Sequence, residues 1–206
     1  MRAPVKLYLA SSNPGKLKEY RVLAEQAPAS SSVSVELELL PEFSSLPEFE
    51  EDAPTFAGNA TGKALHYSRW NEEFVFADDS GLVVPALGGA PGVHSARYAG
   101  ADATNSQRIE KLLREMRDKT GAERSAHFIC AIALARKGSA LAVVTDRVDG
   151  EILELPRGAG GFGYDPVFYF ASLKKAFAEL SPEEKNQYSH RGKAFRKLLA
   201  SLSSML

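Results

Sequence analysis

Two adjacent carboxylates, Asp78 and Asp79, are the residues whose types and spacing point most directly to chemistry. They follow the apolar run Phe74 to Ala77, which is typical of a short buried strand, and precede Ser80-Gly81, which is typical of a turn. Neighbouring carboxylates are costly to desolvate unless they hold a cation or accept hydrogen bonds. Ligands collect at the carboxyl ends of strands in α/β proteins, so the pair predicts a metal-assisted site with one Asp as a base. The alternative is a solvated Asp-Asp turn that caps the following segment.

The segment from Ser11 to Lys16 lies between an alternating strand pattern and a helical pattern. Ser12 or Asn13 can cap the helix, and Pro14 suits its first turn. A helix N-terminus with free N–H groups and a nearby Lys attracts phosphate, although the spacing here is not that of a Walker loop. The segment therefore predicts phosphate binding, with an ordinary strand-to-helix turn as the alternative.

A glycine-rich segment covers residues 158–168 and carries aromatic side chains. Its glycines allow positive φ angles and close backbone approach, so Phe162 and Tyr164 are expected on a loop. Aromatic rings on such a loop can stack on a nucleobase, an interaction worth roughly 1–3 kcal/mol per base. Asp165 can accept a hydrogen bond from a ring N–H or cap the next turn. The alternative is a hairpin whose aromatic side chains cover the edge of the core.

The segment from Ser181 to Lys193 gathers basic side chains between two predicted helices. Ser181-Pro182 followed by two acids is a strong helix start, and a second helix is expected from about Ser189 toward the C-terminus. Basic side chains crowd the junction between them, namely Lys185, His190, Arg191 and Lys193. They can bind an anion or donate to a carbonyl oxygen, whereas the alternative is a solvated basic helix end.

Six segments in order along the chain, these four among them, make the sequence resemble the inosine triphosphate pyrophosphatase family. The segments are Ser11-Ser12-Asn13-Pro14-Gly15-Lys16, Thr55-Phe56-Ala57-Gly58-Asn59-Ala60 with Lys63-Ala64, Ala77-Asp78-Asp79-Ser80-Gly81-Leu82, Gly89-Ala90-Pro91-Gly92-Val93-His94-Ser95-Ala96-Arg97-Tyr98, Gly160-Gly161-Phe162-Gly163-Tyr164-Asp165-Pro166 and Ser189-His190-Arg191-Gly192. The resemblance implies an α/β fold: an elongated mixed β-sheet flanked by helices, with two lobes and a central substrate cleft. It also implies a homodimer.

The activity that the resemblance implies is hydrolysis of ITP, dITP and XTP to the monophosphate and pyrophosphate with Mg²⁺. Asp79 is then the general base and a metal ligand, and Asp78 supports it as a second ligand. Phe162 is expected to stack on the base, while Lys185, His190 and Arg191 face its 6-oxo edge and disfavour ATP. The residues expected to bind substrate are Ser11, Ser12, Asn13, Pro14, Gly15, Lys16, Lys63, Ser80, Phe162, Gly163, Tyr164, Asp165, Lys185, His190 and Arg191.

One departure from the family pattern concerns Gly58, where the family usually has a Glu that is implied to bind the metal. Because magnesium often needs only one or two carboxylates plus substrate phosphates, its loss weakens metal binding without necessarily abolishing it. Carboxylates also lie upstream, at Glu50, Glu51 and Asp52. Two alternatives stay open: a nucleotide-binding protein with weak or lost catalysis, and a related pyrophosphatase acting on modified pyrimidine or methylated nucleotides.

Composition agrees with a single enzyme domain over residues 1–206. The net charge of -1 gives no electrostatic case for nucleic-acid binding. The lone Cys130 excludes an intrachain disulfide and is expected in a buried strand. No apolar run reaches a membrane-spanning length and no signal-peptide core is seen, so the cytoplasm is the expected location.

The remaining elements are predicted from hydrophobic periodicity and turn signals. Strands are expected at 5–11, 33–39, 74–77, 125–136 and 139–150, with a hairpin turn at Lys137-Gly138. Helices are expected at 14–27, 55–71 and 104–119. A Ser-rich turn (29–32) and an exposed Pro- and Glu-rich loop (41–54) connect the first of these elements.

Overall fold

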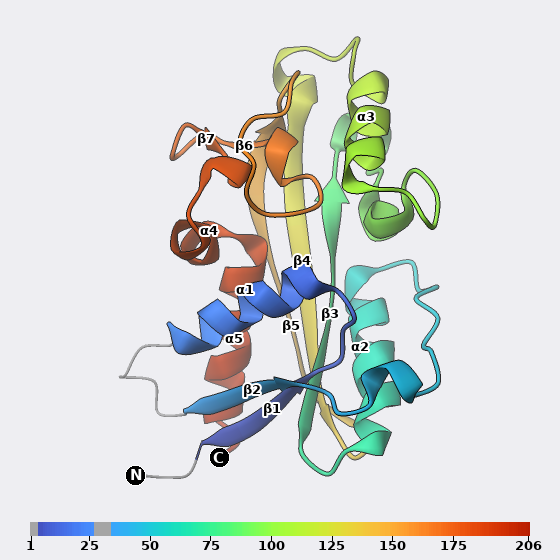
Figure 1. Ribbon diagram of the computed structural model, residues 1–206, viewed down its shortest axis with the longest axis vertical. Coiled ribbons are helices and arrows are strands. Elements are labelled where there is room, and N and C mark those ends of the chain that lie inside the picture. The colour runs from blue at the N-terminus through green and yellow to red at the C-terminus, as the bar shows by residue number, and fades with distance from the viewer. Residues whose placement is uncertain (1–3, 27–33) are drawn as a thin grey trace. The chain divides into compact units, whose positions relative to one another are not determined.

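The computed structural model describes residues 4–26 and 34–206 of the chain (Figure 1). In this part of the chain seven strands form one sheet in the order β2-β1-β3-β4-β5-β6-β7. The strands are β1 (Val5–Leu9), β2 (Val35–Leu39), β3 (Phe74–Val83), β4 (Ser125–Arg136), β5 (Ser139–Ile152), β6 (Phe168–Phe170) and β7 (Lys175–Ala176). The α-helices are α1 (Pro14–Glu25), α2 (Phe56–Tyr67), α3 (Asn105–Glu115), α4 (Pro182–Tyr188) and α5 (His190–Ser203).

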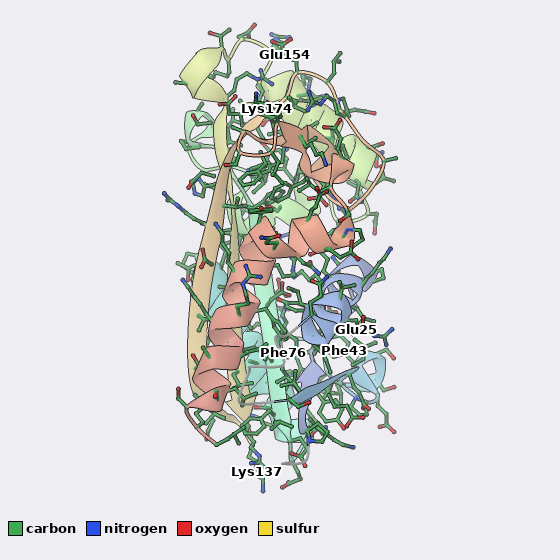
Figure 2. All side chains as sticks on the ribbon, turned by 90° about the vertical axis from the view of Figure 1, so that its left-hand side faces the viewer. Glu25, Phe43, Phe76, Lys137, Glu154 and Lys174 are labelled. Atoms are coloured by element: carbon green, nitrogen blue, oxygen red, sulfur yellow. The ribbon has the colours of Figure 1, made fainter. Side chains whose placement is uncertain are left out.

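The sheet is mixed, which confirms the predicted fold class. β1 pairs in parallel with both β2 and β3, while β6 pairs antiparallel with β5 and β7. β4 and β5 are joined by the predicted tight turn, where Lys137 and Gly138 both have positive φ (51° and 74°). Figure 2 shows Lys137 at that end of the strands.

The described residues divide into two compact units, each assembled from separated segments. The first unit takes residues 1–79, 130–146 and 191–206, and the second takes 80–129 and 147–190. Because the segments interleave, neither unit is a stretch of sequence that could be excised. The assignment of one functional domain to residues 1–206 stays a prediction.

The first unit packs helices on both faces of its strands. α1 and α5 lie on one face and α2 on the other, as both views show (Figures 1 and 2). The core under α1 and α5 centres on Tyr20, whose ring lies 5.0 Å from Phe76 and 5.2 Å from Phe195. α5 contributes five apolar side chains to this core: Ala194, Phe195, Leu198, Leu199 and Leu202.

The second unit has its own apolar core, built on α3 and the surrounding strands. α3 supplies Ile109 and Leu112 to this core, and its C-cap residue Met116 also belongs to it. Phe128 of β4 lies 4.6 Å from Phe168 of β6, ring centre to ring centre. The short strands β6 and β7 were not expected from the sequence, because three-residue and two-residue strands carry too little periodicity to detect.

Several element boundaries differ from the predicted ones. The strand expected at 74–77 runs on to Val83, so Ser80-Gly81 is strand and not a turn. The helix expected at 55–71 ends at Tyr67 and continues as a 3₁₀ turn to Trp70. The Ser-rich turn predicted at 29–32 lies outside the described residues.

Candidate active site

Asp78 and Asp79 lie within β3 rather than after its end, which corrects the predicted location. Successive side chains of a strand point to opposite faces, so the two carboxyl groups meet different helices. Asp78 points toward α1 and Cys130, and Asp79 toward Asn59 of α2. The strand end that places ligands here is that of β1, since Leu9 pairs with Phe76 and the chain then turns into the Ser11–Lys16 segment.

Asp79 is a buried carboxyl group with few compensating contacts. Its side chain accepts a hydrogen bond of 2.9 Å from Asn59 Nδ2, and the residue is 5% exposed. Burial raises the pKa of Asp79 to about 6; the Asn59 bond opposes this rise, the nearby Glu51 carboxylate adds to it, and the Lys16 and Lys63 ammonium groups oppose it. A carboxylate with a pKa near neutrality is suited to accept a proton from water.

Glu51 is the acidic residue that sequence reasoning noted but did not assign to the site. It comes from the loop before α2 and forms an ion pair with the Nζ of Lys63. Lys63 lies one turn after Asn59 on α2, so both side chains point the same way. The resulting group of Glu51, Asn59, Lys63 and Asp79 is called the Asp79 cluster below. From the sequence, only the spacing of Asn59 and Lys63 by one helical turn could have indicated this cluster.

Gly58 occupies a capping position of α2. Its N–H donates to Thr55 Oγ1 at 3.0 Å, and Thr55 is the N-cap residue. A Glu at this third helical position would complete a capping box with Thr55, because its side chain can reach back to the N-cap N–H. The absence of Glu at position 58 therefore changes the helix cap, and the carboxylate beside Lys63 is supplied by Glu51.

Asp78 is the opposite of Asp79 in its charge environment. Its carboxyl oxygens lie 2.8 Å from Lys16 Nζ and 3.3 Å from Arg191 Nε. Burial raises the pKa of Asp78, but the Lys16 and Arg191 cations outweigh burial and hold that pKa well below its usual range. Arg191 in turn pairs with Glu19 of α1. Lys16, Glu19, Asp78 and Arg191 are called the Asp78 cluster below.

The Ser11–Lys16 segment is closed by its own hydrogen bonds. Asn13 Oδ1 accepts from the N–H groups of Gly15 and Lys16 at 2.9 and 3.2 Å, and Asn13 N–H donates to Ser11 Oγ at 3.2 Å. Of the two caps that the sequence allowed, Ser12 and Asn13, the structure has Asn13. Since these N–H groups already have acceptors, the Lys16 ammonium, 13% exposed, is the donor best placed for an anion.

The second unit holds Phe162, Asp165 and Lys185 together. Asp165 accepts a 2.8 Å hydrogen bond from the N–H of Phe162 and forms an ion pair with Lys185 Nζ. Both charged residues are nearly fully buried, and Lys185 Nζ lies 4.9 Å from the centre of the Phe162 ring. Asp165 therefore fixes both the aromatic ring and the ammonium group.

Three other predicted residues occupy distinct environments in the second unit. His190 is buried and stacks on Phe128 with ring centres 4.7 Å apart. Tyr164 donates to the backbone oxygen of Ser95 at 3.0 Å and belongs to the core. Gly163 has a φ of +62°, so the loop turn there favours glycine.

Arg191 contacts other residues than those with which the sequence analysis grouped it. Its guanidinium lies in the Asp78 cluster of the first unit, while Lys185 and His190 belong to the second. Consecutive helical residues point about 100° apart, so neighbours at the start of α5 can serve different surroundings. The predicted contact of Arg191 with a base stays a prediction, and its ion pairs favour another role.

Comparison with known proteins gives one consistent family. The model of the Ham1 family matches residues 7–201. A dITP/XTP pyrophosphatase of Geobacillus kaustophilus (strain HTA426) is 50% identical over 192 residues, covering 93% of this chain and 91% of the relative. A dITP/XTP pyrophosphatase of Thermosynechococcus vestitus (strain NIES-2133 / IAM M-273 / BP-1) is 49% identical, covering 92% and 91%.

Solved structures agree with the sequence comparisons. A HAM1 protein from Coxiella burnetii matches with a TM-score of 0.82 and 40% identity, covering 97% of this chain and 99% of that one. The Ham1 protein of Staphylococcus aureus matches with a TM-score of 0.82 and 36% identity, covering 98% and 100%. The family match over residues 7–201, the sequence relatives and the solved structures agree, and the chain belongs to the Ham1 family.

Proposed function

We propose that the protein hydrolyses deaminated purine nucleoside triphosphates, namely ITP, dITP and XTP, to the monophosphate and pyrophosphate. The observation that carries the proposal is Asp79, a buried carboxyl group with a pKa near 6 that the ammonium groups of Lys16 and Lys63 act on electrostatically. A base of this kind beside cations suits attack of water on a phosphorus atom. The names of the relatives support the substrate class.

The first unit is assigned the triphosphate. Lys16 and Lys63 are its cations, and Ser11, Ser12 and Asn13 surround the start of α1. Asp79 accepts the proton of the attacking water as the bond to the α-phosphorus forms, and pyrophosphate leaves. Ser80, the next residue of β3 and the first residue of the second unit, is assigned a contact with substrate.

Magnesium is the proposed cofactor, and the residues fit it with a change of ligand. Among residues 4–26 and 34–206 no three His, Cys, Asp or Glu side chains are grouped to hold a metal. Asp79 and Glu51 are two carboxylates whose mutual repulsion a cation would relieve, and magnesium accepts one or two carboxylates plus phosphates. We assign Asp79 and Glu51 as ligands in preference to Asp78, which already has cationic partners. Bound magnesium neutralises phosphate charge and polarises the phosphoryl oxygens.

The second unit is assigned the purine base. Phe162 supplies a stacking face, and Lys185 beneath it supplies an ammonium donor for the 6-oxo group of hypoxanthine or xanthine. His190 is assigned to the same edge, with Gly163, Tyr164 and Asp165 shaping the loop. Adenine presents a 6-amino donor, which would leave buried donors unpaired, so ATP is disfavoured.

The test is pyrophosphate release from ITP, XTP, dITP, ATP and GTP, each with and without magnesium. Fast, magnesium-dependent release from the first three, and slow release from ATP and GTP, is expected. ITP binding without release from any substrate would instead favour a binding protein, an alternative that the pyrophosphatase relatives and the Glu51 carboxylate do not favour.

The proposed setting is a homodimer in the cytoplasm. Among the described residues no helix is long and apolar enough to cross a membrane. Light scattering on the purified protein tests the oligomer, and a monomer at micromolar concentration would contradict it.

A further inference from the structure

The Asp78 cluster contains a residue that the proposed reaction has not used, Glu19. It lies on α1 one helical turn after Lys16, and its side chain is 12% exposed. Its Oε2 lies 2.5 Å from Arg191 Nη1. A glutamate so nearly buried is rare unless it is paired, and here its partner is a guanidinium that is itself 2% exposed.

Arg191 also contacts Asp78. Its Nε lies 3.3 Å from Asp78 Oδ2, and its guanidinium carbon lies 5.8 Å from the centre of the Tyr20 ring. The thiol of Cys130 lies 3.8 Å from the same Asp78 oxygen. The guanidinium is therefore held between two carboxylates and an aromatic face, with little freedom to move.

Asp78 in turn contacts Lys16. Its Oδ1 lies 2.8 Å from Lys16 Nζ, and the same ammonium lies 3.3 Å from the backbone oxygen of Asp78. In the part of the chain that the structure describes, Lys16 Nζ makes these two contacts and no other, so one of its three N–H donors remains for a ligand. The order of charges is Glu19, Arg191, Asp78, Lys16, alternately negative and positive with a sum of zero.

The physical consequence is that the charge of Glu19 determines how strongly the Asp78 carboxylate is attracted to Arg191 relative to Lys16. With Glu19 present, Arg191 has two carboxylates, and Asp78 can hold Lys16 as well. Without the Glu19 charge, the buried guanidinium loses one of these two carboxylates, so it attracts Asp78 more strongly and draws it away from Lys16. A lysine ammonium on a flexible stem is then less well placed to meet a phosphate.

We infer that Glu19 is a positioning residue, which through Arg191 and Asp78 fixes the Lys16 ammonium for the triphosphate; this inference rests on the proposed function. Glu19 does not itself touch substrate in this account. Its effect on binding is therefore expected to pass through Lys16 and to vanish when Lys16 has no charge.

The experiment is a double-mutant cycle in the full chain, with inorganic tripolyphosphate as the probe and calorimetry as the readout. E19Q is compared with the parent, and the pair K16M and K16M/E19Q is compared likewise. E19Q is expected to raise the dissociation constant roughly tenfold in the parent and less than about twofold beside K16M. E25Q is the matched control, because Glu25 lies exposed at the far end of the same helix (Figure 2) and should change nothing.

Equal losses in both backgrounds would show a merely structural role for Glu19 and overturn the inference. If E19Q does not fold, E19D replaces it, because its side chain is one methylene shorter and weakens the contact with Arg191 while the buried charge is kept. A smaller loss is then expected in the parent and none beside K16M. Pyrophosphate release from ITP is measured separately on the parent protein. Absence of that release would refute the proposed function, while the binding cycle would still decide whether Glu19 acts through Lys16.

Discussion

At the scale of single residues, Asp78 and Asp79 show how one chemical group acquires two characters from its surroundings. Asp78 has cations on both oxygens, so its ionised form is stabilised by folding. Asp79 is buried beside a neighbouring carboxylate, and although the Asn59 amide favours its ionised form, burial outweighs that bond and the ionised form is disfavoured. The two side chains follow one another in the sequence, and the alternation of the strand alone separates their roles.

Asp79→Asn is expected to stabilise the metal-free protein at pH 8. The folded-state pKa of Asp79, about 6, lies above the ordinary aspartate value of 3.8, so ionising Asp79 above pH 6 costs about 3 kcal/mol of folding free energy. This cost develops as the pH rises from 3.8 to 6 and has largely disappeared at pH 4. Urea unfolding with a chelator should therefore show a gain at pH 8 that shrinks at pH 4. Turnover should be lost at both pH values, and a stable, active variant would refute the base assignment.

Asp78→Asn is expected to have the opposite effect, which is to destabilise the folded protein. It removes one carboxylate from the buried Arg191 and the carboxylate from Lys16, which costs about 3–5 kcal/mol for a broken buried pair. Urea unfolding at pH 7 measures the loss. A change below about 1 kcal/mol would mean that water replaces the carboxylate at this site.

Glu51→Gln is expected to raise the magnesium concentration needed for half-maximal turnover by roughly tenfold, because one oxygen ligand loses its charge. It also removes the partner of Lys63, so the Michaelis constant is recorded in the same titration. Glu50→Gln is the matched control, since Glu50 is exposed. Equal magnesium titrations for the two variants would remove Glu51 from the proposed metal site.

At the scale of elements, the site depends on where β3 and the helices stop. The apolar run that predicted a strand at 74–77 ends at Asp78, yet pairing continues the strand to Val83. The hydrophobic pattern could not predict this continuation of the strand. Aspartate is typical of turns, and its burial in a strand depends on partners that are distant in the sequence. The cap of α1 could be predicted as Ser12 or Asn13, since capping chemistry is local, and it is Asn13. The different contacts of the Arg191 and His190 side chains could not be predicted, because they depend on packing around the first turn of α5.

Gly81→Ala is expected to destabilise the protein by about 2–4 kcal/mol through overpacking. A Cβ at position 81 would lie 2.3 Å from Ser95 Oγ and 2.6 Å from the backbone oxygen of Gly92. Ser95 Oγ also accepts a 2.9 Å hydrogen bond from the N–H of Leu82, which the intrusion would break. Thermal unfolding measures the effect, and Ser95→Ala separates the lost hydrogen bond, worth about 1 kcal/mol, from the clash. Equal losses in the two variants would show that the clash is relieved.

At the scale of the whole molecule, the two units hold different parts of the proposed chemistry. The family resemblance, which rests on the order of the motifs, predicted the fold class and the set of candidate site residues. It could not predict which unit each residue joins, since both units are built from interleaved segments. Lys16, Lys63 and Asp79 belong to the first unit, and Phe162, Asp165 and Lys185 to the second. Variants in the two units should therefore differ in kind as well as in size.

Lys63→Met is expected to lower kcat/KM for ITP and ATP by the same factor, since both nucleotides carry the same triphosphate. Lys185→Met is expected to lower kcat/KM for ITP by roughly a hundredfold and to leave ATP almost unchanged, because it removes a donor meant for the 6-oxo group. The ITP-to-ATP ratio is the readout. A ratio that changes equally in both variants would contradict this division of roles.

The contribution of α5 to the first core also bears on how the chain folds during synthesis. Translation proceeds at about 5–20 residues per second, and α5 is made after every other element of that core. For several seconds β1, β3 and α1 exist without the five side chains that cover them, leaving Tyr20 and Phe76 without Phe195. The nascent chain thus presents an apolar surface that a chaperone can bind, and a premature stop before residue 194 would leave that surface uncovered permanently.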